Sequence, residues 1–327
     1  MKLLIISLAL FFVSALAQNH LVILMYHHVD NGTPPTTSIQ PEQFEAHLNA
    51  LDDLELQVVD LVDALELLDR QQKLPTGAVA LTFDDAWQSV YHNAHPILQD
   101  RGLPYSIFVP TQASNQERPL SLTWDQMRSL DQQGVRILNH SHDHSSLSQL
   151  SIDEAIANIE LAQQHLESEL GKELPKILAY PYGDYSLALA DALNERGYWA
   201  LGQHSGAFGP PMNWQSIPRY PLDGIYANLH SAKIKMASKP LPLAQENRID
   251  PVTEASPPRL ELKLSRSLAN NNSLNCFWRN QAMEIEWLDQ LTFATQASEP
   301  FTGRSRYNCT ISHGNEVYWF SQPWIVH

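Results

Sequence analysis

The sequence has very few cysteines. Of its 327 residues only Cys276 and Cys309 are cysteine, so at most one disulfide can form within the chain. Export to an oxidising compartment, predicted below, favours pairing of these two residues. Two free buried thiols are the alternative. Closing a loop of this size would contribute roughly 3 to 4 kcal/mol in the chain-entropy model, which matters for a small domain.

The sequence also lacks a long apolar run after residue 17. No later stretch approaches the roughly 20 apolar residues that a membrane span needs, so a spanning helix is excluded. Residues 1–17 contain one Lys, a long apolar core and a small-residue ending at Ala15 and Ala17, which is typical of a secretory signal peptide. Position 18 is Gln rather than Cys, so no lipid anchor is expected. The chain is predicted to be secreted or periplasmic.

Basic residues are scarce. The chain has 21 Lys and Arg against 36 Asp and Glu, a formal net charge of −15. Nucleic acid is therefore a poor partner. From Arg259 onward there are six Lys or Arg and six Asp or Glu, so the excess of acidic residues belongs to the part of the chain before Arg259. An acidic surface would tolerate or attract a cationic polymer, but it is also ordinary for a soluble protein, and we favour that second interpretation.

Apolar runs alternate with amphipathic stretches in the first two thirds of the chain. Helices are expected after Ser151 and Thr123, each of which opens a capping box, the first helix running to about Leu170. This alternation predicts an α/β fold with a mostly parallel sheet, a distorted barrel. The expected strands are Leu21 to Tyr26, Val79 to Phe83, Ser106 to Val109, Val135 to Leu138 and Ile177 to Tyr180.

The amino-acid composition and the hydrophobic pattern change near residue 238. Residues 238–258 are rich in Pro and lack periodicity, which predicts a linker between a barrel at 18–237 and a final domain at 259–327. The final domain has short alternating segments typical of a small β-sandwich. Tyr307 stands two residues before Cys309 and Trp287 lies between the cysteines, which suggests an immunoglobulin-like sandwich. The expected strands are Leu260 to Leu264, Met283 to Trp287 and Val317 to Phe320.

Two clusters of polar residues follow predicted strands. Asp84 and Asp85 end an apolar run, and His140, His142 and His144 come just after a later strand. Since catalytic groups of such barrels gather at the carboxyl ends of the strands, the clusters can meet. Two or three imidazoles with one carboxylate suit a catalytic metal site. Helical curvature would place His140 and His144 on one face, whereas an extended segment would align all three histidines. The structural alternative is that Asp84 caps a helix starting near Ala86.

These motifs resemble a known family. Thr82 to Asp85, His140-Ser141 with His144, and Tyr180-Pro-Tyr-Gly183 are similar in order and spacing to the successive motifs of the polysaccharide deacetylases, carbohydrate esterase family 4, also called the NodB-homology domain. The resemblance covers roughly residues 21 to 239 and implies a distorted (β/α) barrel that removes N-acetyl groups from an amino-sugar polymer with the help of a metal. No Gly-x-Ser-x-Gly motif is present, which argues against a serine hydrolase.

The resemblance also implies roles for individual residues. Asp85, His140 and His144 would hold the metal, and Asp84 would be the base that removes a proton from the attacking water. A divalent cation makes this possible near neutral pH by lowering the pKa of water and polarising the acetyl carbonyl. The backbone N–H of Tyr182 would help to stabilise the oxyanion. Zn²⁺ is the expected metal, with Co²⁺, Ni²⁺ or Fe²⁺ as alternatives.

The general acid is less clear from the sequence, because the family commonly uses a late histidine. Here His204 and His230 lie in weak contexts. The segment Leu24 to Val29 resembles the first strand of the poly-β-1,6-N-acetylglucosamine deacetylase branch, which points to His27 as the acid, with His28 as its close competitor. A structural histidine that caps the first strand is the alternative for His27.

Two further positions depart from the family pattern. The Arg that steadies the catalytic base is replaced by Ala179; Arg219 is a possible substitute, although a surface Arg is the favoured interpretation. Asn213-Trp214 is faintly similar to an Asp-Trp motif whose Trp lines the acetyl pocket, but a core Trp is at least as good an interpretation.

Three functions are compatible with these observations. The first is an exported, metal-dependent N-deacetylase of an N-acetylglucosamine-containing glycan. The second is a carbohydrate-binding or cell-surface protein whose barrel has lost activity, suggested by Ala179 and the missing late histidine. The third is a deacetylase acting on O-acetyl esters. The His27 motif favours β-1,6-linked N-acetylglucosamine as the substrate, and chitin-like oligomers and peptidoglycan are the alternatives. The sequence does not predict the oligomeric state.

Overall fold

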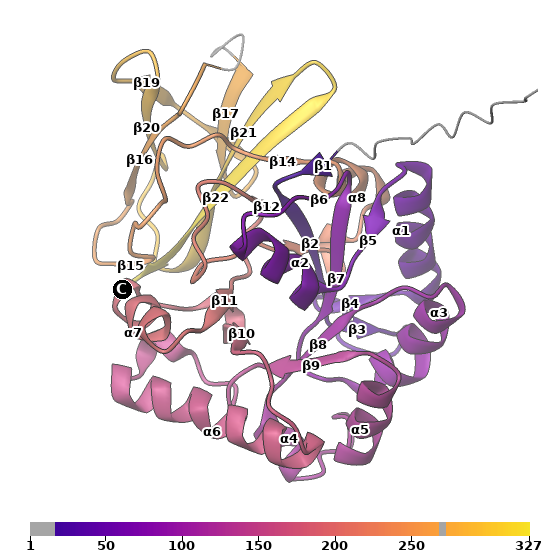
Figure 1. The fold of residues 1–327 in the computed structure, drawn as a ribbon. Coiled ribbons are helices and arrows are strands. Elements are labelled where there is room, and N and C mark those ends of the chain that lie inside the picture. The colour runs from indigo at the N-terminus through magenta and orange to yellow at the C-terminus, as the bar shows by residue number, and fades with distance from the viewer. Residues whose placement is uncertain (1–16, 268–272) are drawn as a thin grey trace, which may run out of the picture.

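The computed structural model describes residues 17–267 and 273–327. The predicted signal peptide, residues 1–17, lies outside this range except for Ala17. Within the described ranges, no helix combines the length and the apolar character that crossing a membrane requires. The chain forms an α/β barrel followed by an all-β region, which packs on the side of the barrel that carries β11 and α7 (Figure 1).

A curled sheet of nine strands forms the barrel, in the order β11-β10-β9-β8-β7-β2-β12 with β13 beside β2 and β5 beside β7. All five strands expected from the apolar runs are present, and they pair in parallel. The predicted (β/α) barrel is thereby confirmed. The strands are β2 Leu21–Tyr26, β5 Gln57–Val58, β7 Ala78–Phe83, β8 Ser106–Val109, β9 Arg136–Asn139, β10 Ile177–Ala179, β11 Trp199–Leu201, β12 Ala207–Phe208 and β13 Tyr220–Pro221.

The strands are buried on both faces, yet their side chains sort into two cores by alternation. On β7, Ala78 and Ala80 point into the barrel, where helix α2 fills one end. Val79, Leu81 and Phe83 pack outward against the surrounding helices. Because successive side chains alternate, a polar residue two positions beyond an inward residue also points inward. This register directs the groups at the carboxyl ends of the strands into the barrel mouth.

The segment 217–222 joins the two edges of the sheet. At one edge the Gly202 amide donates a hydrogen bond to the Ile217 carbonyl. At the other, Tyr220 pairs with Leu24 on β2, and the Leu222 amide donates to the Met25 carbonyl. This closing segment, residues 217–222, therefore links β11 to β2.

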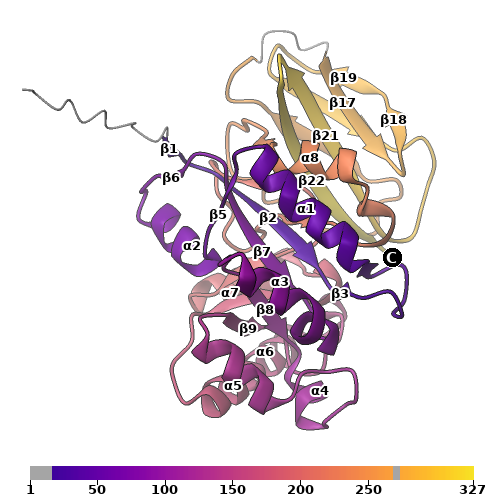
Figure 2. The same cartoon turned by 90° about the vertical axis from the view of Figure 1, so that its right-hand side faces the viewer.

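Helices cover the outside of the sheet, with α1, α3 and α5 on the side that faces the viewer in Figure 2. The two predicted capping boxes are present, at Ser151 for α6 and at Thr123 for α5, and each satisfies backbone N–H groups in the first turn. The helices are α1 Pro41–Asp53, α2 Leu61–Asp69, α3 His95–Asp100, α4 Thr111–Asn115, α5 Trp124–Gln132, α6 Ile152–Leu170, α7 Leu187–Glu195 and α8 Leu229–Met236. Short helical turns are η1 Val90–Ala94, η2 Leu147–Gln149, η3 Pro181–Gly183 and η4 Gly224–Tyr226, and short strand pairs are β1 Ala17–Gln18 with β6 Leu74–Pro75 and β3 His28–Val29 with β4 Ser38–Ile39.

The C-terminal region consists of two sheets that enclose one apolar core. One sheet has the order β14-β22-β21-β17-β18 with β15 beside β22, and the other has the order β16-β20-β19. Residues 238–258, predicted as a linker, contribute β14 and β15, both of which pair in parallel with β22. The strands are β14 Lys239–Pro240, β15 Val252–Thr253, β16 Arg259–Lys263, β17 Leu274–Trp278, β18 Gln281–Met283, β19 Ile285–Trp287, β20 Thr292–Gln296, β21 Gly303–His313 and β22 Glu316–Val326.

The two cysteines form the expected disulfide, Cys276–Cys309. They are direct partners on the neighbouring strands β17 and β21, so the bond lies within one sheet. The disulfide of immunoglobulin domains crosses between the sheets instead. Tyr307 is buried, and its hydroxyl donates to the Pro258 carbonyl. The structure supports a two-sheet β region but does not confirm the immunoglobulin-like detail.

Removing the disulfide should destabilise the β region. For Cys276→Ala with Cys309→Ala we expect a loss of about 3 to 4 kcal/mol in its free energy of unfolding, because the bond closes a loop with a sequence separation of 33. Denaturant unfolding followed by Trp fluorescence, with and without reductant, measures the loss. A wild-type midpoint that reductant does not change would contradict the prediction.

Candidate active site

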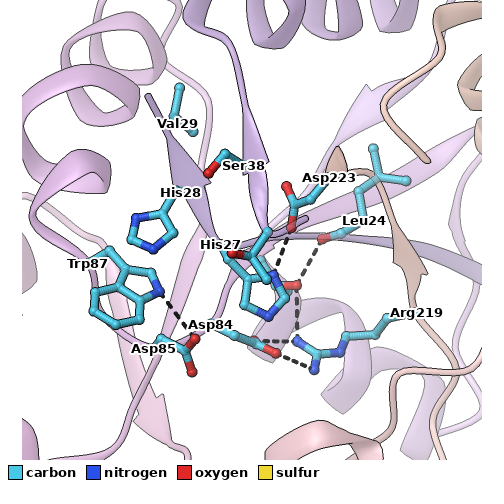
Figure 3. Close-up of polar contacts among 12 residues, drawn as sticks. Leu24, His27, His28, Val29, Ser38, Asp84, Asp85, Trp87, Arg219 and Asp223 are labelled. Atoms are coloured by element: carbon cyan, nitrogen blue, oxygen red, sulfur yellow. Dashed lines mark hydrogen bonds and ion pairs between the residues drawn. The ribbon is translucent and has the colours of Figure 1, made fainter. Parts of the chain in front are cut away.

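Asp84 lies at the end of β7 and points into the barrel, continuing the inward register of Ala80 and Thr82. It is fully buried, and both of its carboxylate oxygens accept hydrogen bonds of 2.7 Å from the Arg219 guanidinium (Figure 3). Burial disfavours the ionised carboxylate, but Arg219, with His140 nearby, outweighs burial and lowers the pKa of Asp84. The helix-cap alternative for Asp84 is therefore wrong.

Arg219 comes from the closing segment and is itself fully buried. Its Nε also donates to the Gly202 carbonyl at 2.9 Å, so three of its nitrogens have fixed partners. The interpretation of Arg219 as a surface residue is wrong, and the alternative, that it substitutes for the Arg missing at position 179, agrees with this contact. Ala179 instead offers its backbone carbonyl to the site.

Asp85, His140 and His144 converge on one point. One ligand atom from each can be chosen so that all three lie within 4.8 Å of one another. The Asp85 Oδ1 atom is 3.4 Å from His140 Nε2 and 3.0 Å from His144 Nε2. Among the described residues this is the only such group of three or more His, Cys, Asp or Glu side chains.

The chemistry of these atoms fits a divalent cation. Asp85 Oδ1 and His140 Nε2 are buried and have no hydrogen-bond partner among residues 17–267 and 273–327. Buried polar atoms are costly without a partner, and a cation would satisfy both. His140 Nδ1 donates to the Ala179 carbonyl at 2.7 Å, which leaves the Nε2 lone pair directed to the site. Two imidazoles and one carboxylate match the three protein ligands of catalytic zinc.

The backbone around these ligands is unusual. Positive φ angles occur at Asp85, Ala86, Ser141, His144 and Tyr182, which is half of the non-glycine residues with this conformation in the described chain. Such angles cost energy and persist where the surrounding structure enforces them, often at functional sites. The turn they create brings His144 back beside His140.

The same turn directs His142 away from the ligands. His142 Nδ1 lies 2.8 Å from the Thr111 hydroxyl, and its ring packs on His165. Because Ser141 and His144 have positive φ, the segment is neither a helix nor an extended strand. Of the two geometries expected from the sequence, the pairing of His140 with His144 is the one that the structure shows.

The second carboxylate oxygen of Asp85 is held by an aromatic side chain. Trp87 Nε1 donates to Asp85 Oδ2 at 3.1 Å, and the Trp87 ring stacks on His28 with 4.4 Å between ring centroids (Figure 3). This contact leaves Oδ1 free for a cation. Trp87 was not predicted as a site residue, although its place two residues after Asp85 is a usable signal.

His27 follows β2 in the inward register of Ile23 and Met25 and lies beside Asp84 (Figure 3). Its Nδ1 lies 2.7 Å from Asp223 Oδ2 (Figure 3). Burial lowers the pKa of His27, but the bond to Asp223 and the nearby charges of Asp84 and Asp85 outweigh burial and raise it to about 9. His27 is therefore protonated at neutral pH. Asp223 was not predicted as a site residue, although it lies just after β13 as Asp84 lies after β7.

The other candidate histidines lie in poorer positions for a proton donor. His28 is buried against Trp87, and burial lowers its pKa. Burial, with the charges of Arg306 and Arg219, lowers the pKa of His204 to about 3, so it is neutral. His230 is exposed on α8.

Two further residues of the sequence analysis can now be placed. The Tyr182 ring contacts the His144 ring edge to face, with 4.6 Å between centroids. Trp214 packs against Trp199 and Phe208, which agrees with the core interpretation. The fold and this site together define a (β/α) barrel with a candidate metal centre at the carboxyl ends of its strands.

Comparison with known proteins shows which family part of this chain resembles. Residues 71–201 match the family model for polysaccharide deacetylase. The putative polysaccharide deacetylase YxkH of Bacillus subtilis is 28% identical over 178 residues, which is 54% of this chain and 62% of YxkH. The poly-beta-1,6-N-acetyl-D-glucosamine N-deacetylase of Staphylococcus aureus (strain MRSA252) is 25% identical over 195 residues, 56% of this chain and 67% of that protein. Residues 71–201 are thus similar to the polysaccharide deacetylase family, while the match to YxkH spans less than two thirds of that protein.

Solved structures show the same fold. The Streptococcus pyogenes deacetylase PplD in complex with acetate superposes with a TM-score of 0.61 at 22% identity, covering 66% of this chain and 98% of PplD. IcaB from Ammonifex degensii gives a TM-score of 0.59 at 23% identity, covering 65% of this chain and 97% of IcaB. In both cases about a third of this chain has no counterpart.

Proposed function

We propose that this protein is an exported, metal-dependent polysaccharide N-deacetylase that hydrolyses N-acetyl groups of an N-acetylglucosamine-containing glycan. The observation that carries the proposal is the group of Asp85, His140 and His144 beside the ionised Asp84. In this group the buried Asp85 Oδ1 and His140 Nε2 atoms have no hydrogen-bond partner among the described residues. Similarity to the family and the predicted signal peptide support the substrate class and the location.

In this proposal Asp85, His140 and His144 hold a divalent cation, expected to be Zn²⁺. When bound, the cation lowers the pKa of water and polarises the acetyl carbonyl. Asp84 accepts the proton of the attacking water. Arg219 holds the Asp84 carboxylate through both oxygens, and this paired contact fixes the orientation of the base.

His27 is proposed as the general acid. The leaving amine needs a proton, and His27 is the histidine beside the site that carries one at neutral pH. Asp223 orients the ring through Nδ1 and favours the charged form, which leaves the other ring nitrogen available to donate. The arrangement supplies both an acid and a base at the site.

The backbone N–H of Tyr182 is proposed to stabilise the oxyanion. The turn at η3 uses the amides of Gly183 and Asp184, which donate to Tyr180 and Pro181 respectively. Tyr182 itself has φ of 60° and lies against His144. A fixed backbone donor in this position is the usual means of stabilising developing charge on a carbonyl oxygen.

Two departures from the family pattern suggested a barrel that only binds glycan. Arg219 replaces the Arg missing at position 179, and the contact of Asp223 with His27 replaces a late histidine. These two contacts support an active enzyme over a barrel that only binds glycan.

Metal removal is the first test of the proposal. The purified protein should release acetate from poly-β-1,6-N-acetylglucosamine or chitin oligomers, a chelator should abolish release, and Zn²⁺ or Co²⁺ should restore it. His144→Ala should lose bound metal as measured by elemental analysis. His142→Ala is the matched control, because it changes the same motif outside the ligand group, and should retain metal. Metal-loaded protein that releases no acetate from these N-acetylated glycans would refute the N-deacetylase assignment, and release only from O-acetylated xylan would indicate an esterase.

Replacing Asp223 should change the dependence of activity on alkaline pH. His27 acts while protonated, so activity falls as pH rises through its pKa. Asp223→Asn removes the charge that raises this pKa, and the alkaline limb of kcat/KM should move to lower pH by roughly 1 to 3 units. The shift is toward lower pH because the Asp223 carboxylate contacts His27 directly and favours its protonated form.

Asp53→Asn, on the exposed face of α1, is the control for this shift and should leave the profile unchanged. An alkaline limb that stays in place in Asp223→Asn, with kcat/KM otherwise measurable, would show that His27 is not the acid.

A further inference from the structure

A cavity of about 350 Å³ lies between the barrel and the C-terminal sheets. The barrel contributes the loops after β10 and β11, and the C-terminal region contributes β21, β22 and the turn after β17. Figure 1 shows these sheets beside the β11 edge of the barrel. The volume lies in the range of small-molecule sites. This cavity is called the interdomain cavity below.

The interdomain cavity is rich in positive charge. Three arginines line it, Arg279, Arg304 and Arg306, against one carboxylate, Asp184. They are three of the five arginines in the sequence from residue 259 onward, in a chain whose net charge is −15. Such a concentration of guanidinium groups in an acidic protein indicates recognition of an anion.

Contacts between the barrel and the C-terminal region occupy only some of the N–H groups of these arginines. Arg304 pairs with Asp184 at 2.7 Å, which binds the two parts of the chain together. Arg306 donates from one nitrogen to the Gln203 carbonyl at 3.0 Å. Neither Arg279 nor Arg306 forms an ion pair with a carboxylate in the described part of the chain. A guanidinium has five N–H donors, so most of theirs are available for a ligand.

A buried donor in the same wall lacks a partner. Trp324, 3% exposed, lines the cavity, and its Nε1 has no hydrogen-bond partner among the described residues. An indole N–H can only donate. Because this nitrogen is itself shielded from solvent, the charge that the cavity offers to a ligand comes from the arginines and not from Trp324.

The interdomain cavity adjoins the candidate metal centre. The Tyr182 ring contacts His144 on one side and lies 4.4 Å from the Arg304 guanidinium on the other. Tyr182 and Tyr226 are 44% and 39% exposed and line the cavity, so they offer aromatic surface next to the arginines. A glycan with one acetamido group at the metal ligands would extend past Tyr182 into this space.

We infer that the interdomain cavity is a subsite for an oxyanion substituent, a carboxylate or a phosphate, that the glycan carries beside the N-acetyl group being removed. The inference rests on the proposed function and narrows its substrate. A neutral homopolymer would give Arg279 and Arg306 no countercharge. The preferred substrate is therefore an N-acetylated glycan with regularly spaced anionic groups.

Three tetrasaccharides of equal length test the inference. Chitotetraose is neutral, alternating N-acetylglucosamine and N-acetylmuramic acid carries carboxylates, and 6-O-phosphorylated chitotetraose carries phosphates. Calorimetric binding to Asp84→Asn and kcat/KM of the wild type are both measured. At least one anionic probe should be preferred over the neutral one about tenfold, as one charge-assisted hydrogen bond would give. Arg279→Gln with Arg306→Gln should remove the preference, so that the anionic probes are bound and turned over no better than chitotetraose.

Controls separate the possible results. Arg259→Gln, an exposed Arg on β16, should keep the preference, and Arg306→Lys should keep part of it because the charge stays. Preference for only the carboxylate or only the phosphate probe identifies the group. Equal binding of all three probes, or a preference that survives the double substitution, overturns the inference. Acetate release without charge preference would refute this subsite alone, whereas charge-selective binding without acetate release would refute the deacetylase proposal alone.

Discussion

Asp84→Asn is expected to reduce kcat for acetate release by about 10² to 10⁴, the usual contribution of a positioned general base. The amide keeps the shape of the side chain but cannot accept the proton of water. Metal content should be retained, since Asp84 is outside the group formed by Asp85, His140 and His144. Acetate release at saturating glycan, beside elemental analysis of the same sample, measures both effects.

Asp143→Asn serves as the matched control for this change. Asp143 lies within the His motif but is exposed and accepts a hydrogen bond from the Ser145 amide outside the site. It should leave kcat within about twofold, as surface substitutions usually have small effects. If Asp84→Asn retained similar activity with its metal bound, Asp84 would not be the base.

Arg219→Met is expected to destabilise the barrel by about 3 to 5 kcal/mol, because it leaves the buried Asp84 carboxylate without its countercharge. Both groups are fully buried, and the guanidinium supplies two hydrogen bonds of 2.7 Å. The activity of the folded fraction should also fall, since the base loses its orientation. Urea unfolding monitored by circular dichroism measures the loss of stability.

A double substitution distinguishes the loss of the ion pair between Arg219 and Asp84 from the loss of side-chain packing. Arg219→Met with Asp84→Asn should be several kcal/mol less destabilised than the sum of the single variants, because no unpaired charge is left buried. Arg248→Met breaks a half-exposed pair with Asp191 and should cost no more than about 1 kcal/mol. Additive effects in the double variant would show that the ion pair is not the source of the loss.

The sequence predicts much of the barrel and of the metal centre because those signals are local. Apolar runs mark the five central strands, and the polar residues that follow them fall at one edge of a parallel sheet. This rule places Asp84, Asp85 and His140 at that edge, whereas the division of roles between Asp84 and Asp85 comes from the family resemblance. The exclusion of His142 cannot, because it depends on positive φ angles at Ser141 and His144 that the residue types do not specify.

The groups that tune the site are harder to predict because their contacts are distant in sequence. Arg219 is separated from Asp84 by 135 positions, and Asp223 from His27 by 196. The strand that brings them there, β13, has two residues, one of them Pro221, and carries no periodicity of its own. The inward register is also hidden, because strands with both faces buried show continuous apolar runs.

The closing segment has a consequence for how this protein acquires activity during folding. Residues 217–222 and Asp223 just beyond them provide the partners of both the base and the acid, and they dock only when the first and last strands of the barrel meet. Contacts between residues so far apart in the sequence form late, because closing the long intervening chain costs entropy before the contacts can stabilise the structure. A partly folded chain would therefore hold Asp85, His140 and His144 together before Asp84 and His27 gain their partners Arg219 and Asp223. Catalytic competence would coincide with completion of the barrel.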